Sequence, residues 1–236
     1  MQSLAPGSHA VVVGSGGGIG GALLRALRAD PDIGSVTGMG RRPSQGDLPL
    51  DLEDEASIEA AFASLSAPPR LVIVATGLLH DAVLQPEKSV RALDAEAMAR
   101  AFRINTIGPA LVAKHALSLF PREGRSVFAV LGARVGSIGD NRSGGWHSYR
   151  ASKAALAMLV RTVSIELARG NPNRFCIGLH PGTVDTGLSR PFQRGVAEGR
   201  LFTPKFAAER LLAVIDMLDT ASNGAVLAWD GTIVPP

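Results

Sequence analysis

Short apolar runs alternate with longer segments of helical periodicity along the whole chain. Runs rich in valine, isoleucine and leucine predict strands at 9–14, 33–40, 70–77, 125–132, 174–182 and 224–231. Apolar positions at helical spacing predict helices at 18–29, 55–65, about 91–118 with an interruption at Gly108-Pro109, from Tyr149 onward, and at 205–218. Strands that alternate with helices form right-handed βαβ units. The pattern therefore predicts an α/β fold, a single doubly wound domain over residues 1–236 with a parallel sheet of about seven strands.

Composition narrows the class of protein and its partners. Hydrophobic residues make up 46% and charged residues 19%, and no apolar run reaches the roughly 18 residues that cross a bilayer. The N-terminus has no basic segment followed by an apolar stretch, so we expect a cytoplasmic protein with no membrane partner. The formal net charge is only +3 and the arginines are scattered, which argues against nucleic-acid binding. Cys176 lies in a predicted strand as a small buried hydrophobe, and the five histidines show no metal-ligand spacing.

A glycine cluster, "VVVGSGGGIGG", lies between the first strand and the first helix. Such a turn lets the backbone approach a pyrophosphate and directs free N–H groups at it from a helix N-terminus. Two registers fit: Gly16, Gly18 and Gly21 have the G-x-G-x-x-G spacing, and Gly14, Gly18 and Gly20 have the spacing G-x-x-x-G-x-G. We favour the second register because it begins the turn where the strand ends.

The end of the second strand bears on which dinucleotide binds. An acidic residue there accepts hydrogen bonds from a ribose 2′-OH, whereas arginine suits a 2′-phosphate. The strand runs into Gly40, Arg41 and Arg42. NADP(H) is therefore favoured over NAD(H), against the alternative that both arginines are solvated surface residues. Asp51 and Leu52 are placed to hold the adenine, although Asp51 also suits the N-cap position of the helix predicted to begin at 55.

The only tyrosine of the chain, Tyr149, stands four residues before Lys153. Residues four apart on a helix share a face, so both side chains can enter one pocket. A phenol is a poor acid at neutral pH, and a nearby ammonium lowers its pKa. Tyr149 would then donate a proton to a carbonyl oxygen while the cofactor delivers hydride to the carbon. On spacing alone, a chance pairing is the competing interpretation.

With these motifs in order, the chain resembles the short-chain dehydrogenase/reductase superfamily over essentially its full length. "GSGGGIG" is similar to its cofactor loop, "YRASK" to its Tyr-x-x-x-Lys signature, "RINTIG" to the segment with its relay asparagine, and "HPGTVDT" to its Pro-Gly segment. "GSIGDN", "SRPF" and "AWDGTIVP" resemble the C-factor-like or sniffer-like carbonyl reductase branch. The resemblance implies a Rossmann-type fold and the register Gly14, Gly18 and Gly20. It also implies that Lys153 binds the nicotinamide ribose and that Asn105 holds a water of the proton relay, alongside a structural role in a helix kink.

The resemblance extends to a set of expected cofactor contacts. They are Gly14, Ser15, Gly18, Ile19, Gly20, Arg41, Asp51, Leu52, Gly77, Lys153, Pro181, Gly182, Val184 and Thr186.

The sequence departs from the family pattern after the fifth strand. The family places a serine there that hydrogen-bonds the substrate oxygen, and Ala133 occupies the position that aligns best. Ser137, further along the loop, is the expected replacement, with Asn141 and Ser143 as other donors. Ala75-Thr76-Gly77 stands in place of Asn-Ala-Gly, so a strand-bridging hydrogen bond is expected to be missing.

The resemblance also implies a substrate lid at 187–204 and a homodimer or homotetramer formed through the helices near 94–118 and 149–168. Phe192, Phe202 and Leu188 are expected to make an apolar ceiling. The expected function is NADP(H)-dependent transfer of hydride to or from a ketone, aldehyde or secondary alcohol. The alternatives are a non-catalytic dinucleotide-binding regulatory or signalling protein, and a reductase of an acyl-carrier-bound ketone.

Overall fold

The apolar runs form the centre of an eight-stranded sheet in the computed structural model, which describes residues 1–236. Across the sheet, the strands are β10 (Ile233–Val234), β9 (Val226–Ala228), β6 (Arg174–His180), β5 (Ser126–Leu131), β4 (Pro69–Val74), β1 (Ser8–Val13), β2 (Ile33–Gly40) and β3 (Leu48–Pro49). All neighbours are parallel except β10, which pairs antiparallel with β9. The predicted mostly parallel α/β sheet is confirmed, and the strands that sequence reasoning missed are only two residues long.

Helices follow the predicted segments closely. They are α1 (Gly18–Arg28), α2 (Glu55–Ala63), α3 (Ala95–Phe102), α4 (Gly108–Leu117), α5 (His147–Gly170) and α6 (Pro204–Asp216). The helical segment is interrupted next to Gly108-Pro109, as predicted, because α4 begins at Gly108 and has Pro109 in its first turn. The irregular turn lies just before it, as a π-helical turn at Arg103–Ile107 between α3 and α4. None of the helices is both long enough and apolar enough to span a bilayer.

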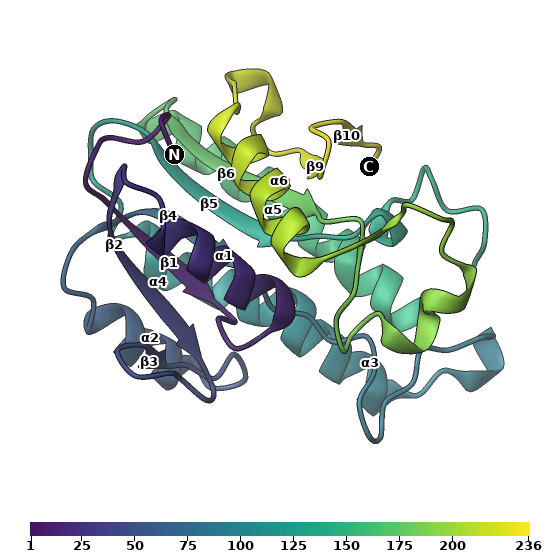
Figure 1. Ribbon diagram of the computed structural model, residues 1–236. Coiled ribbons are helices and arrows are strands. Elements are labelled where there is room, and N and C mark those ends of the chain that lie inside the picture. The colour runs from purple at the N-terminus through teal and green to yellow at the C-terminus, as the bar shows by residue number, and fades with distance from the viewer.

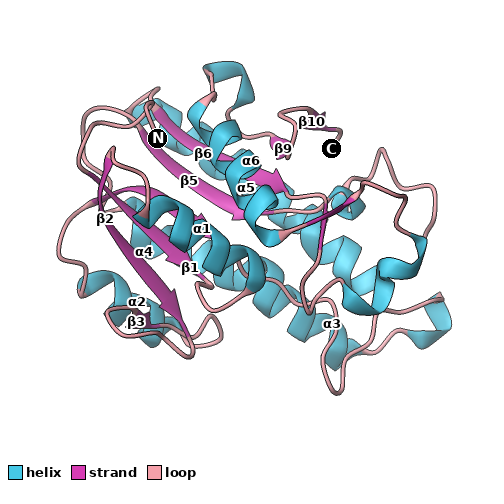
Figure 2. Ribbon diagram, viewed as in Figure 1, coloured by secondary structure: helices cyan, strands magenta, loops and turns pink.

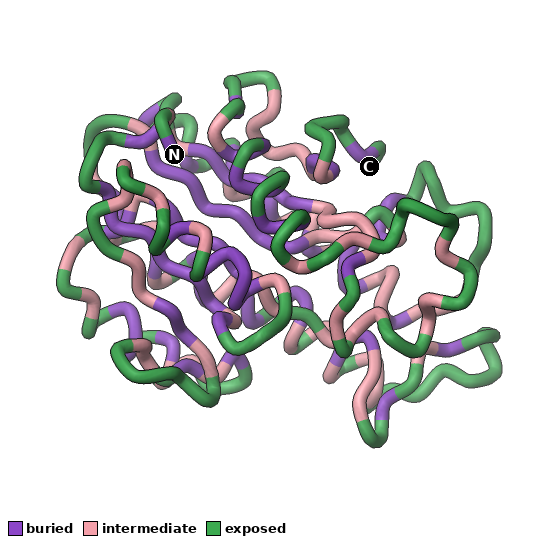
Figure 3. Tube along the Cα trace, viewed as in Figure 1, coloured by how far each residue is buried: buried purple, intermediate pink, exposed green.

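The sheet separates two apolar cores (Figures 1 and 2). On one face the strands pack against α1 and α6, and on the other face they pack against α2, α4 and α5. Every residue of β1 and β5 is buried, so these strands are continuous apolar runs rather than alternating ones. Figure 3 shows the central strands as the buried interior of the chain.

The strand order reverses at β1, which has β2 on one side and β4 on the other. In doubly wound sheets, ligands bind beyond the carboxyl ends of the strands at this switch point. Loops that follow β4, β5 and β6 gather beyond that edge, on the right of Figure 1. Two hydrogen bonds join them: the His80 Nε2 lies 3.2 Å from the Leu188 carbonyl, and the Trp146 N–H donates to the Glu87 carbonyl over 2.6 Å.

The predicted lid at 187–204 contains a 3-10 turn, η4 (Arg190–Gly195), and a short strand. That strand, β8 (Leu201–Phe202), pairs with β7 (Thr183–Val184) in a separate two-stranded sheet. The lid segment therefore begins and ends against the chain that follows β6.

Candidate active site

The turn after β1 is a tight cradle in which specific positions must be glycine. Gly14 has a left-handed φ of 88°, and a Cβ built on it would lie 2.8 Å from Thr76 Cγ2. A Cβ on Gly20, in the first turn of α1, would lie only 2.1 Å from the Gly14 carbonyl oxygen. A Cβ on Gly16 would meet nothing within 4 Å. The steric need for glycine thus falls on the favoured register.

Gly18 and Thr186 come together although 168 positions separate them. A Cβ on Gly18 would lie 2.6 Å from Thr186 Cγ2, so the chain after β6 covers the cradle. Val184 of this segment is buried, and Gly182 packs directly on Phe202. The structure therefore brings the Pro-Gly segment to the glycine turn, as expected for one continuous groove.

The cradle is tied to the end of β2. The N–H groups of Gly14 and Ser15 both donate to the Met39 carbonyl, over 2.7 and 3.2 Å. Arg41 and Arg42 follow directly and are both exposed. Their side chains are thus free to meet an anion beside Ser15.

One carboxylate near β2 escaped sequence reasoning. Asp47 accepts from the Gly38 N–H over 3.1 Å and pairs with Arg28 at 2.6 Å, and its side chain is almost completely buried. Since its oxygens are engaged under β2, this carboxylate belongs to the packing of the strand.

Asp51 does not cap α2. The cap is Asp54, which accepts from the Ala56 N–H over 3.0 Å, while Asp51 accepts from the Glu53 N–H over 3.1 Å. The capping interpretation of Asp51 is therefore wrong. Leu52 is buried against α4, where a Cβ on Gly108 would lie 2.9 Å from its own Cβ.

Tyr149 and Lys153 both lie in the first two turns of α5, and Lys153 is fully buried beside the tyrosine. Its Nζ donates to the Leu131 carbonyl over 2.7 Å and lies 5.9 Å from the centroid of the Tyr149 ring. Burial raises the pKa of Tyr149 to about 12 and lowers the pKa of Lys153 to about 8. The predicted lowering of the Tyr149 pKa is thus not what this structure produces, because desolvation of the phenol dominates.

Asn105 lies in the π-helical turn before α4, and its side chain is completely buried. Its Oδ1 accepts from the Leu78 N–H over 2.7 Å, and its Nδ2 donates to the Leu78 carbonyl and to Ser152 Oγ over 2.8 and 3.1 Å. Ser152 donates in turn to the Tyr149 carbonyl over 2.8 Å. Asn105 therefore joins the loop after β4 to the turn of α5 that carries Tyr149. π-Helical turns are frequent at functional sites.

Gly77 lies at the meeting point of these groups. A Cβ on it would lie 3.7 Å from Asn105 Oδ1, 3.7 Å from Lys153 Nζ and 3.8 Å from Leu188 of the predicted lid. The segment after β4 thus contacts the cradle through Thr76 and the Tyr149–Lys153 pair through Gly77. The Thr76 hydroxyl between these two contacts is buried and has no hydrogen-bond partner.

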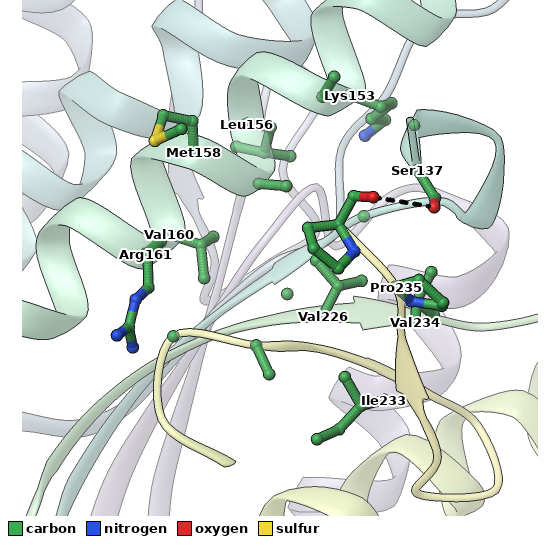
Figure 4. A pocket seen from close by; sticks show the side chains of 18 of the residues that line it. Ser137, Lys153, Leu156, Met158, Val160, Arg161, Val226, Ile233, Val234 and Pro235 are labelled. Carbon is green, nitrogen blue, oxygen red and sulfur yellow. Dashed lines mark hydrogen bonds between the residues drawn. The ribbon is translucent and has the colours of Figure 1, made fainter. Parts of the chain in front are cut away.

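Ser137 is buried, but its hydroxyl is engaged away from Tyr149. It accepts from the Asp140 N–H over 3.0 Å and lies 3.5 Å from the Pro236 carbonyl, the contact drawn in Figure 4. It lines a cavity of about 460 Å³ between α5 and the last strands, together with Lys153 and Met158. The hydrogen-bond partners of the Ser137 hydroxyl are thus Asp140 and Pro236, and Tyr149 is not one of them.

A series of edge contacts between three aromatic rings, those of Trp146, Phe192 and His80, begins at Tyr149. The Trp146 ring stands edge-on to Tyr149 and to the lid residue Phe192, with centroids 6.3 and 4.9 Å apart. His80 meets Phe192 edge-on at 5.5 Å. Phe202, expected in the same ceiling, instead packs on Trp229 at 4.7 Å. Sequence reasoning missed Trp146, and only the two glycines before it signalled an unusual backbone there.

Comparison with known proteins gives a consistent family relationship. The family model described as Enoyl-(Acyl carrier protein) reductase matches residues 32–231. The chain is 34% identical over 185 residues to 1-hydroxy-2-glutathionyl-2-methyl-3-butene dehydrogenase of Rhodococcus sp. (strain AD45), which covers 78% of this chain and 77% of the relative.

Two solved structures share the fold over nearly their whole length. The NADPH-bound carbonyl reductase from chicken fatty liver superposes with a TM-score of 0.84 at 24% identity, covering 99% of this chain and 95% of that one. The carbonyl reductase Sniffer of D. melanogaster gives 0.82 at 21% identity, covering 98% of this chain and 100% of that one. The fold is therefore shared with carbonyl reductases, Sniffer among them, in agreement with the predicted resemblance.

Proposed function

Because the chain belongs to the short-chain dehydrogenase/reductase family of oxidoreductases, we propose that it is an NADPH-dependent reductase of ketones or aldehydes. The observation that carries the proposal is the juxtaposition around Gly77. The glycine cradle, the Pro-Gly segment and the Tyr149–Lys153 pair all face one edge of the sheet.

The cradle fits a dinucleotide because its backbone is open where side chains would block approach. Gly14, Gly18 and Gly20 leave no room for a Cβ, so the first N–H groups of α1 are accessible to a pyrophosphate. Arg41 and Ser15 would hold a 2′-phosphate, which favours NADP(H). The chicken carbonyl reductase of the same fold binds NADPH. When bound, the cofactor supplies the hydride.

Tyr149 acts as the proton donor in this proposal. With its pKa raised to about 12, it is a neutral phenol at physiological pH and carries the proton that a carbonyl oxygen takes up on reduction. Lys153 with a pKa of about 8 is mostly protonated at neutral pH, and its ammonium favours the phenolate left behind. Asn105 holds the turn and organises the return of a proton to Tyr149.

Ser137 is the proposed donor to the substrate oxygen in place of Ala133. Ser137 lines the same cavity as Lys153, which supports the assignment. Its hydroxyl already accepts a hydrogen bond from the Asp140 N–H, so it would have to bind Asp140 and the substrate oxygen together. This engaged hydroxyl is also the observation that favours the second candidate function, a dinucleotide-binding regulatory protein without turnover. Exposed Arg190 and Arg194 on the lid favour a third, reduction of an acyl-carrier-bound ketone.

We further propose a homodimer or homotetramer assembled through α4 and α5. A groove of about 710 Å³ between these helices is lined by Leu117, Leu159 and Val163, and Met158 and Ile165 on α5 are exposed. Covering such apolar surface stabilises a dimer. Light scattering that gives a monomer at micromolar concentration would contradict this.

The test of function combines binding with turnover. Isothermal titration compares NADPH with NADH, and oxidation of NADPH is followed with aromatic aldehydes, diketones, quinones and an acetoacetyl thioester. Tight NADPH binding with turnover of a carbonyl supports the reductase. Binding without turnover supports the regulatory protein, turnover of the thioester alone supports the acyl-carrier reductase, and no binding of either nucleotide would contradict all three.

A further inference from the structure

A buried carboxylate that the proposed mechanism does not use stands at the start of α5. Glu87 lies in the loop between β4 and α3 and is only 7% exposed. Its carboxylate accepts from the Ser148 N–H over 3.2 Å and also from the Ser148 hydroxyl. The helix has no capping side chain of its own, since Trp146 at the N-cap position makes no such bond. Glu87 therefore caps α5 from 61 positions earlier in the chain.

The electrostatics favour an ionised Glu87. Burial alone would raise the pKa of its carboxyl, but the hydrogen bonds from Ser148 and the proximity of His147 outweigh burial and lower the pKa below its usual value. A negative charge is also stabilised at a helix N-terminus. Glu87 is thus a carboxylate at neutral pH. The residue that it binds, Ser148, directly precedes Tyr149 in the helix.

The main chain of Glu87 fixes an unusual backbone conformation. Gly144, Gly145 and Trp146 have successive left-handed φ values of 60°, 65° and 51°, and Trp146 is the only residue other than glycine with a positive φ. That conformation is strained for a residue with a side chain. The Trp146 N–H donates to the Glu87 carbonyl over 2.6 Å, which compensates for the strain.

Arg150 holds the same run from the other side. Its Nε donates to the carbonyls of Gly144 and Gly145 over 3.2 and 3.0 Å, and its guanidinium reaches the Val135 carbonyl over 3.0 Å. The left-handed run is therefore clamped between the β4–α3 loop and the second turn of α5. Strained conformations that the surroundings over-determine cluster at functional sites.

We propose that Glu87 is a positioning residue that sets the orientation of Trp146 and Tyr149. Its carboxylate fixes the first turn of α5, and its carbonyl fixes the backbone of Trp146. Trp146 in turn presents its ring edge to Tyr149 and to Phe192 of the lid. This clamp, formed by Glu87 and Arg150 around residues 144–146, thus links Phe192, Trp146 and Tyr149. The proposal rests on the proposed function of Tyr149 as proton donor.

The test uses Glu87→Ala and Glu87→Gln in the full chain. Glutamine can keep both contacts, by accepting from the Ser148 N–H and donating to its hydroxyl, and it removes only the charge. We expect Glu87→Ala to lower kcat of NADPH-dependent reduction by about 10- to 100-fold, since small misplacements of reacting groups have effects of this size. The Kd for NADPH should not change, and Glu87→Gln should remain close to wild type. Ser148→Ala, which removes one of the two bonds, serves if Glu87→Ala does not fold.

Two further measurements separate positioning from general destabilisation. Asp54→Ala removes a comparable cap from α2, a helix other than the one that carries Tyr149, and should lower stability without lowering kcat. In a Trp229→Phe background, Trp146 is the only tryptophan, and its emission should shift to the red in Glu87→Ala but not in Asp54→Ala.

Unchanged Trp146 emission and kcat in Glu87→Ala would overturn the proposal, and so would equal losses of kcat in Glu87→Ala and Asp54→Ala. The emission does not depend on turnover. A wild-type protein without reductase activity would therefore contradict the proposed function, whereas the emission shift would still test the clamp.

Discussion

Gly20→Ala tests whether the turn after β1 is a cofactor cradle, because the new methyl group has no space. Its Cβ would lie 2.1 Å from the oxygen and 2.8 Å from the carbon of the Gly14 carbonyl, both main-chain atoms that cannot rotate away. The start of α1 and the Gly14 turn must therefore separate. Overpacking of this kind costs about 1–3 kcal/mol of stability.

The same displacement moves the N–H groups that face the proposed pyrophosphate. A hydrogen bond to a charged group contributes about 1.5–3 kcal/mol, and each 1.4 kcal/mol corresponds to about tenfold in Kd. Loss of one such bond therefore raises the Kd for NADPH by about 10- to 100-fold. Urea unfolding and isothermal titration measure the two effects separately.

Gly16→Ala is the matched control, the same substitution in the same turn. A Cβ there meets nothing within 4 Å, and Gly16 has no left-handed φ. We expect its unfolding free energy to stay within about 0.5 kcal/mol of wild type. A weaker effect of Gly20→Ala than of Gly16→Ala on NADPH binding would refute the register and the cradle derived from it.

The remaining predictions concern the side chains of the site. Tyr149→Phe should lower kcat of carbonyl reduction by about 10²-fold or more with an unchanged NADPH Kd, and an equal loss of binding would contradict a proton-donor role. Ser137→Ala should lower stability by about 1 kcal/mol through its lost bond to Asp140, and kcat less than Tyr149→Phe does; a larger fall in kcat would show that its hydroxyl contacts substrate. Burial lowers the pKa of Lys153 to about 8 in the folded chain. Between this pH and the ordinary lysine pKa, Lys153 is neutral in the folded chain and protonated in the unfolded chain. Because the unfolded chain binds more protons there, Lys153 makes stability rise with pH. Urea unfolding of wild type and Lys153→Met at about pH 7 and about pH 9.5 isolates this contribution: the unfolding free energy of wild type minus that of the variant should be larger at the higher pH, and an unchanged difference would contradict it.

The sequence was sufficient for the strands because their apolar runs are buried on both faces. It missed β3 and β10 because two-residue strands carry no periodicity. It also placed the break of the helix near 91–118 at Gly108-Pro109, where a glycine and proline look disruptive. The break lies directly before this pair, in the π-helical turn that contains Asn105, and α4 begins at Gly108.

The sequence predicted the site at positions that accept only one residue type. Gly14 and Gly20 are required by contacts that no other residue permits, and the spacing of Tyr149 and Lys153 follows from helix geometry. The clamp was not predictable, because Glu87 meets Ser148 through the fold and no local pattern joins them. The position of Phe202 was missed for the same reason, since β8 turns it toward Trp229.

Burial keeps the Tyr149 phenol protonated as long as no second positive charge lies close to it. A neutral phenol beside a mostly protonated Lys153 is a site that already holds the proton that a carbonyl oxygen requires. Oxidation of an alcohol needs the opposite state, a phenolate, which burial disfavours unless a second positive charge lies close to the oxygen. The lysine alone does not supply enough, since its Nζ lies 5.9 Å from the ring centroid and is bound to the Leu131 carbonyl. Oxidised nicotinamide carries such a charge and reduced nicotinamide does not, so we expect the Tyr149 pKa to be lower with NADP+ bound than with NADPH bound.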